Sequence, residues 1–252
     1  MKSTLRQWLI GICLALGVVT SAQSTDVRVA VASNFTAPMK VLAQAFEKDA
    51  GHRLALSFGA TGQFYAQIRN GAPFDVLLAA DDETPTKLGA ERHAIAGTQF
   101  TYATGRLVLW SKDPRLVDAK GEILRSGRFD RIAIANPKLA PYGAAAVEVI
   151  NKLGLSALLG TKFVEGANIG QAFQFVASGN AALGFVALSQ VSENGVIKEG
   201  SAWIVPAEMH PPIRQDAILL NSGGQNTAAR ALLEYLRSEK AQMIFRSFGY
   251  AP

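Results

Sequence analysis

Short apolar runs alternate with stretches of helical periodicity along this chain, and that alternation restricts the possible folds more than any other feature. Residues 27–32 (VRVAVA) suit a buried strand, and residues 38–50 then carry apolar side chains at helical spacing. The same succession follows at residues 54–58 and 63–70. Strands that alternate with helices form βαβ units around a largely parallel sheet. We therefore predict an α/β fold.

The rest of the chain continues this pattern. Further strands are predicted at residues 74–80, 107–111, 131–135, 182–188 and 217–220. Further helices are predicted at residues 144–153, 171–178 and 227–245, and a turn-rich segment at residues 89–97. The sequence contains no repeat array and no long linker.

The alternation is interrupted at two places, residues 100–106 and residues 210–214. We interpret the interruptions as two crossings between lobes. The first lobe then combines residues 27–103 with residues 214–252, and the second lobe holds residues 104–213. Two lobes, each a mostly parallel sheet flanked by helices and joined by two crossover strands, suit hinge closure around a ligand.

Four junctions between a predicted strand and a predicted helix are short and contain no Asp or Glu. They are Ala32-Ser33-Asn34-Phe35, Gly59-Ala60-Thr61-Gly62, Ala140-Pro141-Tyr142-Gly143 and Ala167-Asn168-Ile169-Gly170. A helix N-terminus exposes unpaired N–H groups and a partial positive charge. Ligands of open parallel sheets lie beyond the carboxyl ends of the strands, so two junctions from each lobe would face one another. The pattern indicates a site for a fully deprotonated small anion.

A simpler explanation exists for each junction. Taken singly, Ser33, Asn34 and Thr61 are better explained as helix N-caps, and the glycines as ordinary turn residues. Tyr142 could pack its ring on the surface with its hydroxyl in water. Capping and anion binding use the same N–H groups, so both interpretations stay open.

The amino terminus predicts export. Lys2 and Arg6 precede an apolar run at residues 8–19, and Thr20-Ser21-Ala22 supplies a small-residue cleavage site, so we predict a signal peptide over residues 1–22. The apolar run of about 12 residues is too short to span a bilayer. A lipidated N-terminus at Cys13 is the less favoured alternative, because this cysteine lies in the middle of the apolar run.

The residue types for several other chemistries are missing. Cys13 is the only cysteine, so the mature chain has no disulfide, thiol nucleophile or thiolate metal site. The chain has no G-x-S-x-G motif, and His52, His93 and His210 are scattered. Asp81-Asp82 follows a strand without a companion His/Glu cluster. We therefore expect no catalytic residue, no direct metal-ion ligand and no cofactor.

The charged residues are interspersed along the chain. The formal net charge of +5 falls to +3 once the signal peptide, with two basic residues and no acidic ones, is removed. There is no block of Lys and Arg, so we expect no nucleic-acid partner, and we expect a monomer. The ligand-sensing half of a transcription regulator can share a two-lobed architecture. The export signal and the absence of a preceding DNA-binding segment argue against that class.

An ordered set of motifs resembles the molybdate-binding proteins of bacterial ABC uptake systems. The resemblance covers essentially the whole mature chain and implies the two-lobed fold of periplasmic binding proteins. The matching stretches are residues 32–35, 58–62, 65–81 (YAQIRNGAPFDVLLAAD), 100–111 (FTYATGRLVLWS), 134–143 (IANPKLAPYG), 165–172 (EGANIGQA) and 183–188 (LGFVAL).

The resemblance also implies a set of oxyanion ligands. Carried over by position, these are Ser33, Asn34, Thr61, Tyr142 and Ile169. They act in the family through hydroxyl or amide side chains and backbone N–H groups, and Ile169 can offer only its backbone. Some members also use a tyrosine at the position of Ala187, a contact that this chain lacks.

The function implied is that of a periplasmic, non-enzymatic protein that captures molybdate, and tungstate in equal measure, and delivers it to a membrane permease. The absence of a carboxylate from the junctions argues against phosphate, which needs an acceptor for its proton, unless Glu165 points inward. Sulfate has the same charge and shape as molybdate, so a binding protein for sulfate or another tetrahedral oxyanion remains an alternative. A periplasmic enzyme on the same fold is the more remote one.

Overall fold

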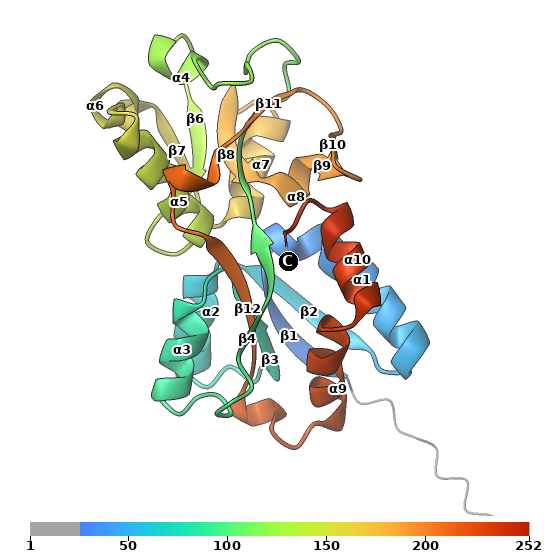
Figure 1. Cartoon of the computed structure of the whole chain (residues 1–252). Helices are drawn as coiled ribbons and strands as arrows, with labels where there is room; N and C mark the ends of the chain where they lie inside the picture. Colours follow the sequence, from blue (N-terminus) through green and yellow to red (C-terminus); the bar gives the residue numbers. More distant parts are fainter. Residues whose placement is uncertain (1–25, 252) are drawn as a thin grey trace, which may run out of the picture.

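Two lobes, each built on its own five-stranded sheet, make up the computed structural model of the chain (Figure 1). The structure describes residues 26–251, so the predicted signal peptide and Cys13 lie outside the described residues. Within residues 26–251, no helix is both long and apolar enough to cross a membrane. The two-lobed α/β architecture predicted from the alternation of elements is confirmed.

The first sheet has the strand order β2-β1-β3-β12-β4. Three of its strands are parallel neighbours: β2 (Leu54–Gly59), β1 (Val27–Ala32) and β3 (Val76–Leu78). The late strand β12 (Ile213–Leu219) lies antiparallel between β3 and β4 (Phe100–Gly105). Strand β12 therefore joins two parts of the sheet that are close in sequence to each other and distant from β12 itself.

Helices cover both faces of the first sheet, with α2 and α3 on one side in Figure 1 and α1, α9 and α10 on the other. Alternate residues of β1 pack against the two helix layers, because successive side chains of a strand point to opposite faces. Val29 and Val31 pack with Met39 of α1, whereas Ala30 packs with Phe64 of α2. The helices are η1 (Ser33–Phe35), α1 (Thr36–Ala50), α2 (Thr61–Arg69), α3 (Glu83–Ala90), η4 (Asn221–Gly223), α9 (Thr227–Leu236) and α10 (Glu239–Ser247).

The second sheet has the strand order β11-β5-β8-β6-β7. Its parallel strands are β7 (Phe163–Gly166), β6 (Ile132–Ala135) and β8 (Leu183–Ala187), and β5 (Leu107–Ser111) and β11 (Ser201–Ile204) complete it in antiparallel pairs. A hairpin of β9 (Ser192–Glu193) and β10 (Val196–Ile197) lies outside the sheet. The helices are α4 (Ile123–Ser126), α5 (Pro141–Lys152), α6 (Ser156–Leu159), η2 (Gly160–Lys162), α7 (Ile169–Ala177), α8 (Leu188–Val191) and η3 (Ala207–Met209).

Two chain segments connect the sheets. Strand β4 of the first sheet continues through Arg106 directly into β5 of the second, and β11 returns through residues 205–212 into β12. Gly105 and Ile213 pair with each other in the first sheet, beside both connections. The lobe boundaries at residues 103/104 and 213/214 stay a prediction.

Several element assignments from the sequence are wrong in detail. The predicted helix 227–245 is two helices: α9 ends at Leu236, and Ser238 caps the start of α10 by accepting from the N–H of Ala241. The predicted strand 217–220 begins at Ile213, directly after Pro211-Pro212. Strands β7 and β11 and helix α3 were not expected, since their runs are short and only weakly apolar.

Candidate functional site

The structure brings the five candidate oxyanion ligands together. Each of the four junctions follows a strand and begins a helix, and all of them meet where the two lobes face each other. One small pocket is lined by parts of three of these junctions and by one residue of the fourth. Its walls include Ser33, Asn34, Thr61, Tyr142 and Ile169, all of them at most 7% exposed.

The alternative of simple N-caps does not describe the first two junctions. The N-cap of α1 is Phe35 and that of α2 is Ala60, and neither makes a side-chain capping bond. Thr61 Oγ1 instead accepts from the N–H of Ala80 at 3.0 Å. At the fourth junction Asn168 is a true cap, whose side chain accepts from the N–H of Gln171. Ser33, Asn34 and Thr61 are therefore buried polar residues without a capping task.

Ser33 links the first junction to the fourth. Its Oγ accepts from the N–H of Gly170, in the first turn of α7, at 3.2 Å. Ile169, the first residue of α7, lies beside this contact, and its carbonyl accepts from Gln190 Nε2 at 3.2 Å. The N–H groups of a first helical turn have no acceptor inside the helix, so the backbone of Ile169 is available to the pocket.

Asn34 lies at the centre of a buried polar cluster that joins the lobes. Its Nδ2 donates to Gln215 Oε1 at 2.7 Å and to the Tyr250 hydroxyl oxygen at 2.8 Å. Its backbone carbonyl accepts from Ser189 Oγ at 2.7 Å and from the Tyr250 hydroxyl at 3.1 Å. Its side-chain Oδ1 is buried and has no partner among the described residues.

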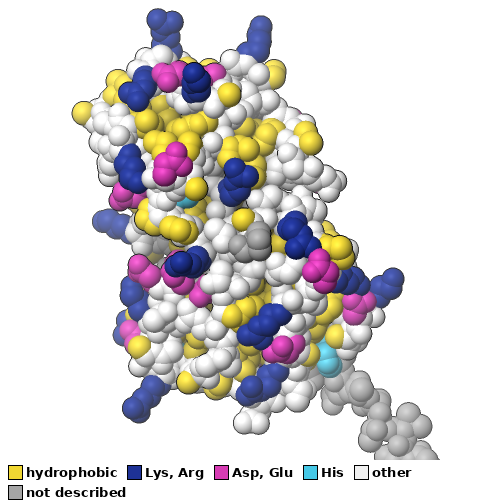
Figure 2. All heavy atoms as spheres, in the orientation of Figure 1, with side chains coloured by type: hydrophobic (Ala, Val, Ile, Leu, Met, Phe, Trp, Pro, Cys, Tyr) yellow, Lys and Arg dark blue, Asp and Glu magenta, His cyan; other side chains and the backbone are white. Residues whose placement is uncertain are grey.

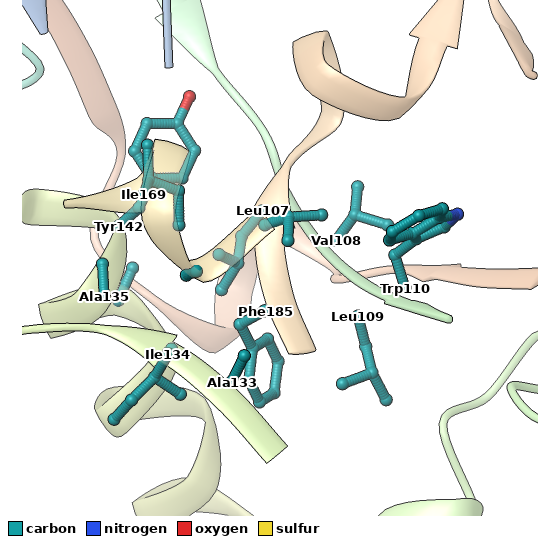
Figure 3. Close-up of a cluster of buried hydrophobic side chains, with 14 of the residues drawn as sticks. Leu107, Val108, Leu109, Trp110, Ala133, Ile134, Ala135, Tyr142, Ile169 and Phe185 are labelled. Carbon is teal, nitrogen blue, oxygen red and sulfur yellow. The ribbon is translucent and has the colours of Figure 1, made fainter. Parts of the chain in front are cut away.

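Tyr142 reaches from α5 toward the strands that connect the lobes. The ring is 1% exposed and lies in the same buried cluster as Ile169 (Figure 3). A Cβ added to Gly105 of β4 would lie 2.0 Å from the Tyr142 hydroxyl oxygen, so the close approach requires glycine there. That hydroxyl has no hydrogen-bond partner among the described residues, and burial raises the pKa of Tyr142 well above its usual value.

A further contact between the lobes lies at the second and third junctions. The N–H of Gly62, in the first turn of α2, donates to the carbonyl of Leu139 at 2.9 Å. Leu139 belongs to the loop between β6 and α5. A Cβ on Gly62 would lie 3.1 Å from both the Cα and the carbonyl oxygen of Leu139, so the two backbones nearly touch.

No carboxylate lines the small pocket. Glu165, the one acidic residue near a junction, is exposed on β7 and does not reach it. Acidic residues lie instead in a larger neighbouring cleft between the lobes, together with Lys87 and Lys138. There Asp81 accepts from the N–H of Thr84 at 2.7 Å, and burial raises the pKa of its carboxyl. The small pocket thus offers neutral donors and helix N-termini.

Sequence reasoning missed three residues that surround Asn34: Ser189, Gln215 and Tyr250. They lie 155, 181 and 216 positions away from Asn34 along the chain, so no local pattern could have connected them with it. Ala187, where a tyrosine was noted as missing, is buried and does not line the pocket. Within residues 26–251, no three His, Cys, Asp or Glu side chains are grouped to hold a metal ion.

Comparison with known proteins gives consistent matches over nearly the whole chain. The molybdate-binding protein ModA of Azotobacter vinelandii is 55% identical over 240 residues, 95% of each chain. ModA of Rhodobacter capsulatus is 47% identical over 248 residues, 98% of this chain and 96% of its own. A solved periplasmic molybdate-binding protein of Azotobacter vinelandii superposes with a TM-score of 0.87 at 40% identity, covering 90% of this chain and 99% of that one.

The profile of the bacterial extracellular solute-binding protein family matches residues 27–251, which is the whole two-lobed structure. This match agrees with the fold and with the position of the pocket between the lobes. The chain therefore belongs to the bacterial extracellular solute-binding proteins and, within them, to the family of the molybdate-binding protein ModA.

Proposed function

We propose that this protein captures molybdate between its two lobes and delivers it to the permease of an ABC importer. The observation that carries the proposal is a buried pocket at the meeting of four helix-initiating junctions, lined by neutral donors and free of carboxylates. The proposed ligands are Ser33, Asn34, Thr61, Tyr142 and Ile169. The names of the relatives at 55% and 47% identity support the choice of molybdate.

The chemistry of the pocket suits a dianion. Molybdate carries no proton at neutral pH, so every contact with it must be a donor. Hydrogen bonds to a charged group contribute about 1.5–3 kcal/mol each, and several of them offset the cost of removing the ion from water. Hydrogen phosphate needs an acceptor for its own proton, and the pocket has no carboxylate to provide one.

Closure of the lobes is part of the proposal. Hydrogen bonds between Gly62 and Leu139, between Ser33 and Gly170 and between Asn34 and Ser189 join the lobes around the pocket. The two connecting segments would act as the hinge, with residues 27–103 and 214–252 moving against residues 104–213. Such closure encloses a ligand by bringing both halves of its site together.

A thermal-shift titration tests the function. Purified protein is melted with molybdate, tungstate, sulfate or phosphate, because a ligand of the folded state stabilises it by about 2.7 kcal/mol at a hundred times its Kd. We expect molybdate and tungstate to raise Tm at micromolar concentrations and sulfate to do so only at far higher ones. A shift with sulfate or phosphate and none with millimolar molybdate would rule the assignment out and favour the alternative oxyanion.

The cellular setting follows from the same proposal. We propose that residues 1–22 direct export and are removed, leaving a periplasmic, monomeric protein without catalytic activity. On the face drawn in Figure 2, Lys and Arg side chains are scattered over both lobes with acidic side chains among them. This distribution supports a solvated surface over a nucleic-acid interface. N-terminal sequencing of the periplasmic protein tests the cleavage site.

A further inference from the structure

The side-chain amide of Asn34 has both of its hydrogens committed inside the protein. One is donated to Gln215 Oε1 at 2.7 Å and the other to the Tyr250 hydroxyl oxygen at 2.8 Å. Its Oδ1 is buried and has no partner among residues 26–251, in a residue that lines the pocket. In this position Asn34 offers an oxyanion no side-chain donor, because an amide nitrogen has only two hydrogens.

Rotation of the Asn34 side-chain amide by a half-turn exchanges the positions of Nδ2 and Oδ1. Nδ2 then occupies the place of Oδ1 and is free to donate to an anion, while Oδ1 faces Gln215 and Tyr250. The Tyr250 hydroxyl can donate to Oδ1, since a hydroxyl is both donor and acceptor. Gln215 presents Oε1 to Asn34 and cannot donate to it unless its own amide turns as well.

Rotation of the Gln215 side-chain amide affects a segment that connects the lobes. Gln215 Nε2 donates to the carbonyl of Ile213 at 3.1 Å, and Ile213 is the first residue of β12. A Cβ added to Gly105, which pairs with Ile213, would lie 3.1 Å from Gln215 Nε2. When Gln215 Nε2 turns toward Asn34, it loses its hydrogen bond to the carbonyl of Ile213, which lies beside both connecting segments.

We propose that Asn34, Gln215 and the Ile213 carbonyl form a two-position amide relay, in which Gln215 is a positioning residue that decides whether Asn34 donates to the bound oxyanion. The relay rests on the proposed function. In one position Asn34 presents an acceptor to the pocket, and in the other it presents a donor. Occupancy by a dianion favours the second position and changes a hydrogen bond at the start of β12.

Substitution of Gln215 by Glu tests the relay. A carboxylate accepts from Asn34 Nδ2 but cannot donate to its Oδ1, so it holds Asn34 in the position that withholds its donor. We expect Gln215→Glu to bind molybdate about tenfold to a hundredfold more weakly, the loss of one charge-assisted hydrogen bond. Gln215→Met can neither accept from nor donate to Asn34 and adds no charge, so we expect it to weaken binding less than Gln215→Glu does.

A double-mutant cycle separates the relay from plain repulsion between the new carboxylate and the anion. In an Asn34→Ala background the relay has no target, so Gln215→Glu should then weaken binding by less than about threefold. Repulsion would act equally in both backgrounds. An equal loss with and without Asn34, or a Gln215→Met variant as weak as Gln215→Glu, would overturn the relay.

The same experiment distinguishes failure of the relay from failure of the proposed function. If the wild-type protein does not bind molybdate, both the proposed function and the relay are wrong. If Asn34→Ala weakens binding but its effect and that of Gln215→Glu simply add, the relay is wrong and the proposed function stands. Gln242→Met is the matched control, because Gln242 Nε2 also donates to backbone carbonyls, of Tyr102 and Leu236, far from Asn34 in sequence and outside the pocket. Circular dichroism melts confirm that each variant folds.

Discussion

The backbone N–H of Gly170 donates to Ser33 Oγ at 3.2 Å, and this bond joins the start of α7 in one lobe to the end of β1 in the other. A Cβ on Gly170 would lie 3.4 Å from the Ser33 Cβ, so the two residues are in close contact. The hydroxyl of Ser33 accepts one hydrogen bond here and keeps its own proton to donate. Ser33 is thus placed to donate to the anion while it accepts the hydrogen bond that joins the lobes.

Replacement of Ser33 by Ala should weaken molybdate binding about tenfold or more, because both the donor to the anion and the acceptor for Gly170 are lost. Isothermal titration calorimetry measures the change. Ser126→Ala is a suitable control, since Ser126 is exposed on α4 and its Oγ bonds only nearby backbone, donating to the carbonyl of Ile123 and accepting from the N–H of Arg128. Equal affinity of Ser33→Ala and wild type would remove Ser33 from the site.

Thr61→Ala and Asn34→Ala should each weaken oxyanion binding by about tenfold to a hundredfold while the protein still unfolds cooperatively. Thr61→Ser keeps the hydroxyl that accepts from Ala80 and should restore most of the affinity. Calorimetric titration combined with urea unfolding separates binding from folding. Should both alanine variants bind like wild type, these residues serve only the fold.

Gly105→Ala should disturb the position of Tyr142, because the added Cβ would lie 2.0 Å from its hydroxyl oxygen. Overpacking of this kind costs about 1–3 kcal/mol of stability, and we expect about tenfold weaker binding as α5 moves. The second substitution Tyr142→Phe removes the clashing oxygen and should recover part of the stability. Gly89→Ala places its new Cβ with no described atom within 4 Å, and since Gly89 lies in α3 it should leave binding unchanged without lowering stability.

Alkaline pH should destabilise the protein between about pH 10 and pH 12. Burial raises the pKa of Tyr250 from 10.0 to about 12, and it also raises the pKa values of Tyr102 and Tyr142. The unfolded chain therefore loses tyrosine protons that the folded chain still holds, so stability is complete below pH 10 and falls as the pH rises toward 12. For Tyr250 the loss is about 2–3 kcal/mol.

Urea unfolding at pH 8, 10 and 11 measures this effect. Tyr250→Phe loses hydrogen bonds to Asn34 and Ser189 and should be less stable at pH 8, yet its stability should fall less steeply above pH 10. An alkaline slope identical to that of wild type would mean that Tyr250 does not titrate in this range.

Small-angle X-ray scattering should report a smaller radius of gyration with saturating molybdate than without it. The hydrogen bond from Gly62 to Leu139 and the bond from Gly170 to Ser33 form only when the lobes are close. Gly62→Val, whose side chain would meet the Leu139 backbone, should reduce the compaction. Identical radii in both states would count against hinge motion.

Local patterns predicted the elements that begin with a strongly apolar strand. Residues 27–32 and 107–111 match β1 and β5 in both boundaries, because both runs are largely apolar and stop at a polar residue, β1 just before Ser33 and β5 with Ser111. Residues 100–106 were predicted only as one of the two crossings between the lobes, and β4 (Phe100–Gly105) lies there as a strand of the first sheet. Its pairing with β12, more than 100 positions later, could not be predicted, because no local window contains that partner.

The candidate site likewise contains residues that could be predicted from the sequence and residues that could not. The junctions at Ser33 and Thr61 could be found because a strand end followed by a helix start is visible in a short stretch of sequence. Gln215 could not be found, since it reads as an ordinary strand residue until the fold places it 2.7 Å from Asn34. This contact forms only when β12, from the last part of the chain, enters the sheet that β1 began.

The insertion of β12 between β3 and β4 has a consequence for the order of synthesis. A growing chain that ends near residue 200 already holds β3 and β4 but has nothing to join them, because their only common neighbour in the sheet begins at Ile213. The first lobe can complete its sheet only when β12, within the last sixth of the chain, has been made. An incomplete chain therefore cannot close the first lobe, which would suit the export that we propose.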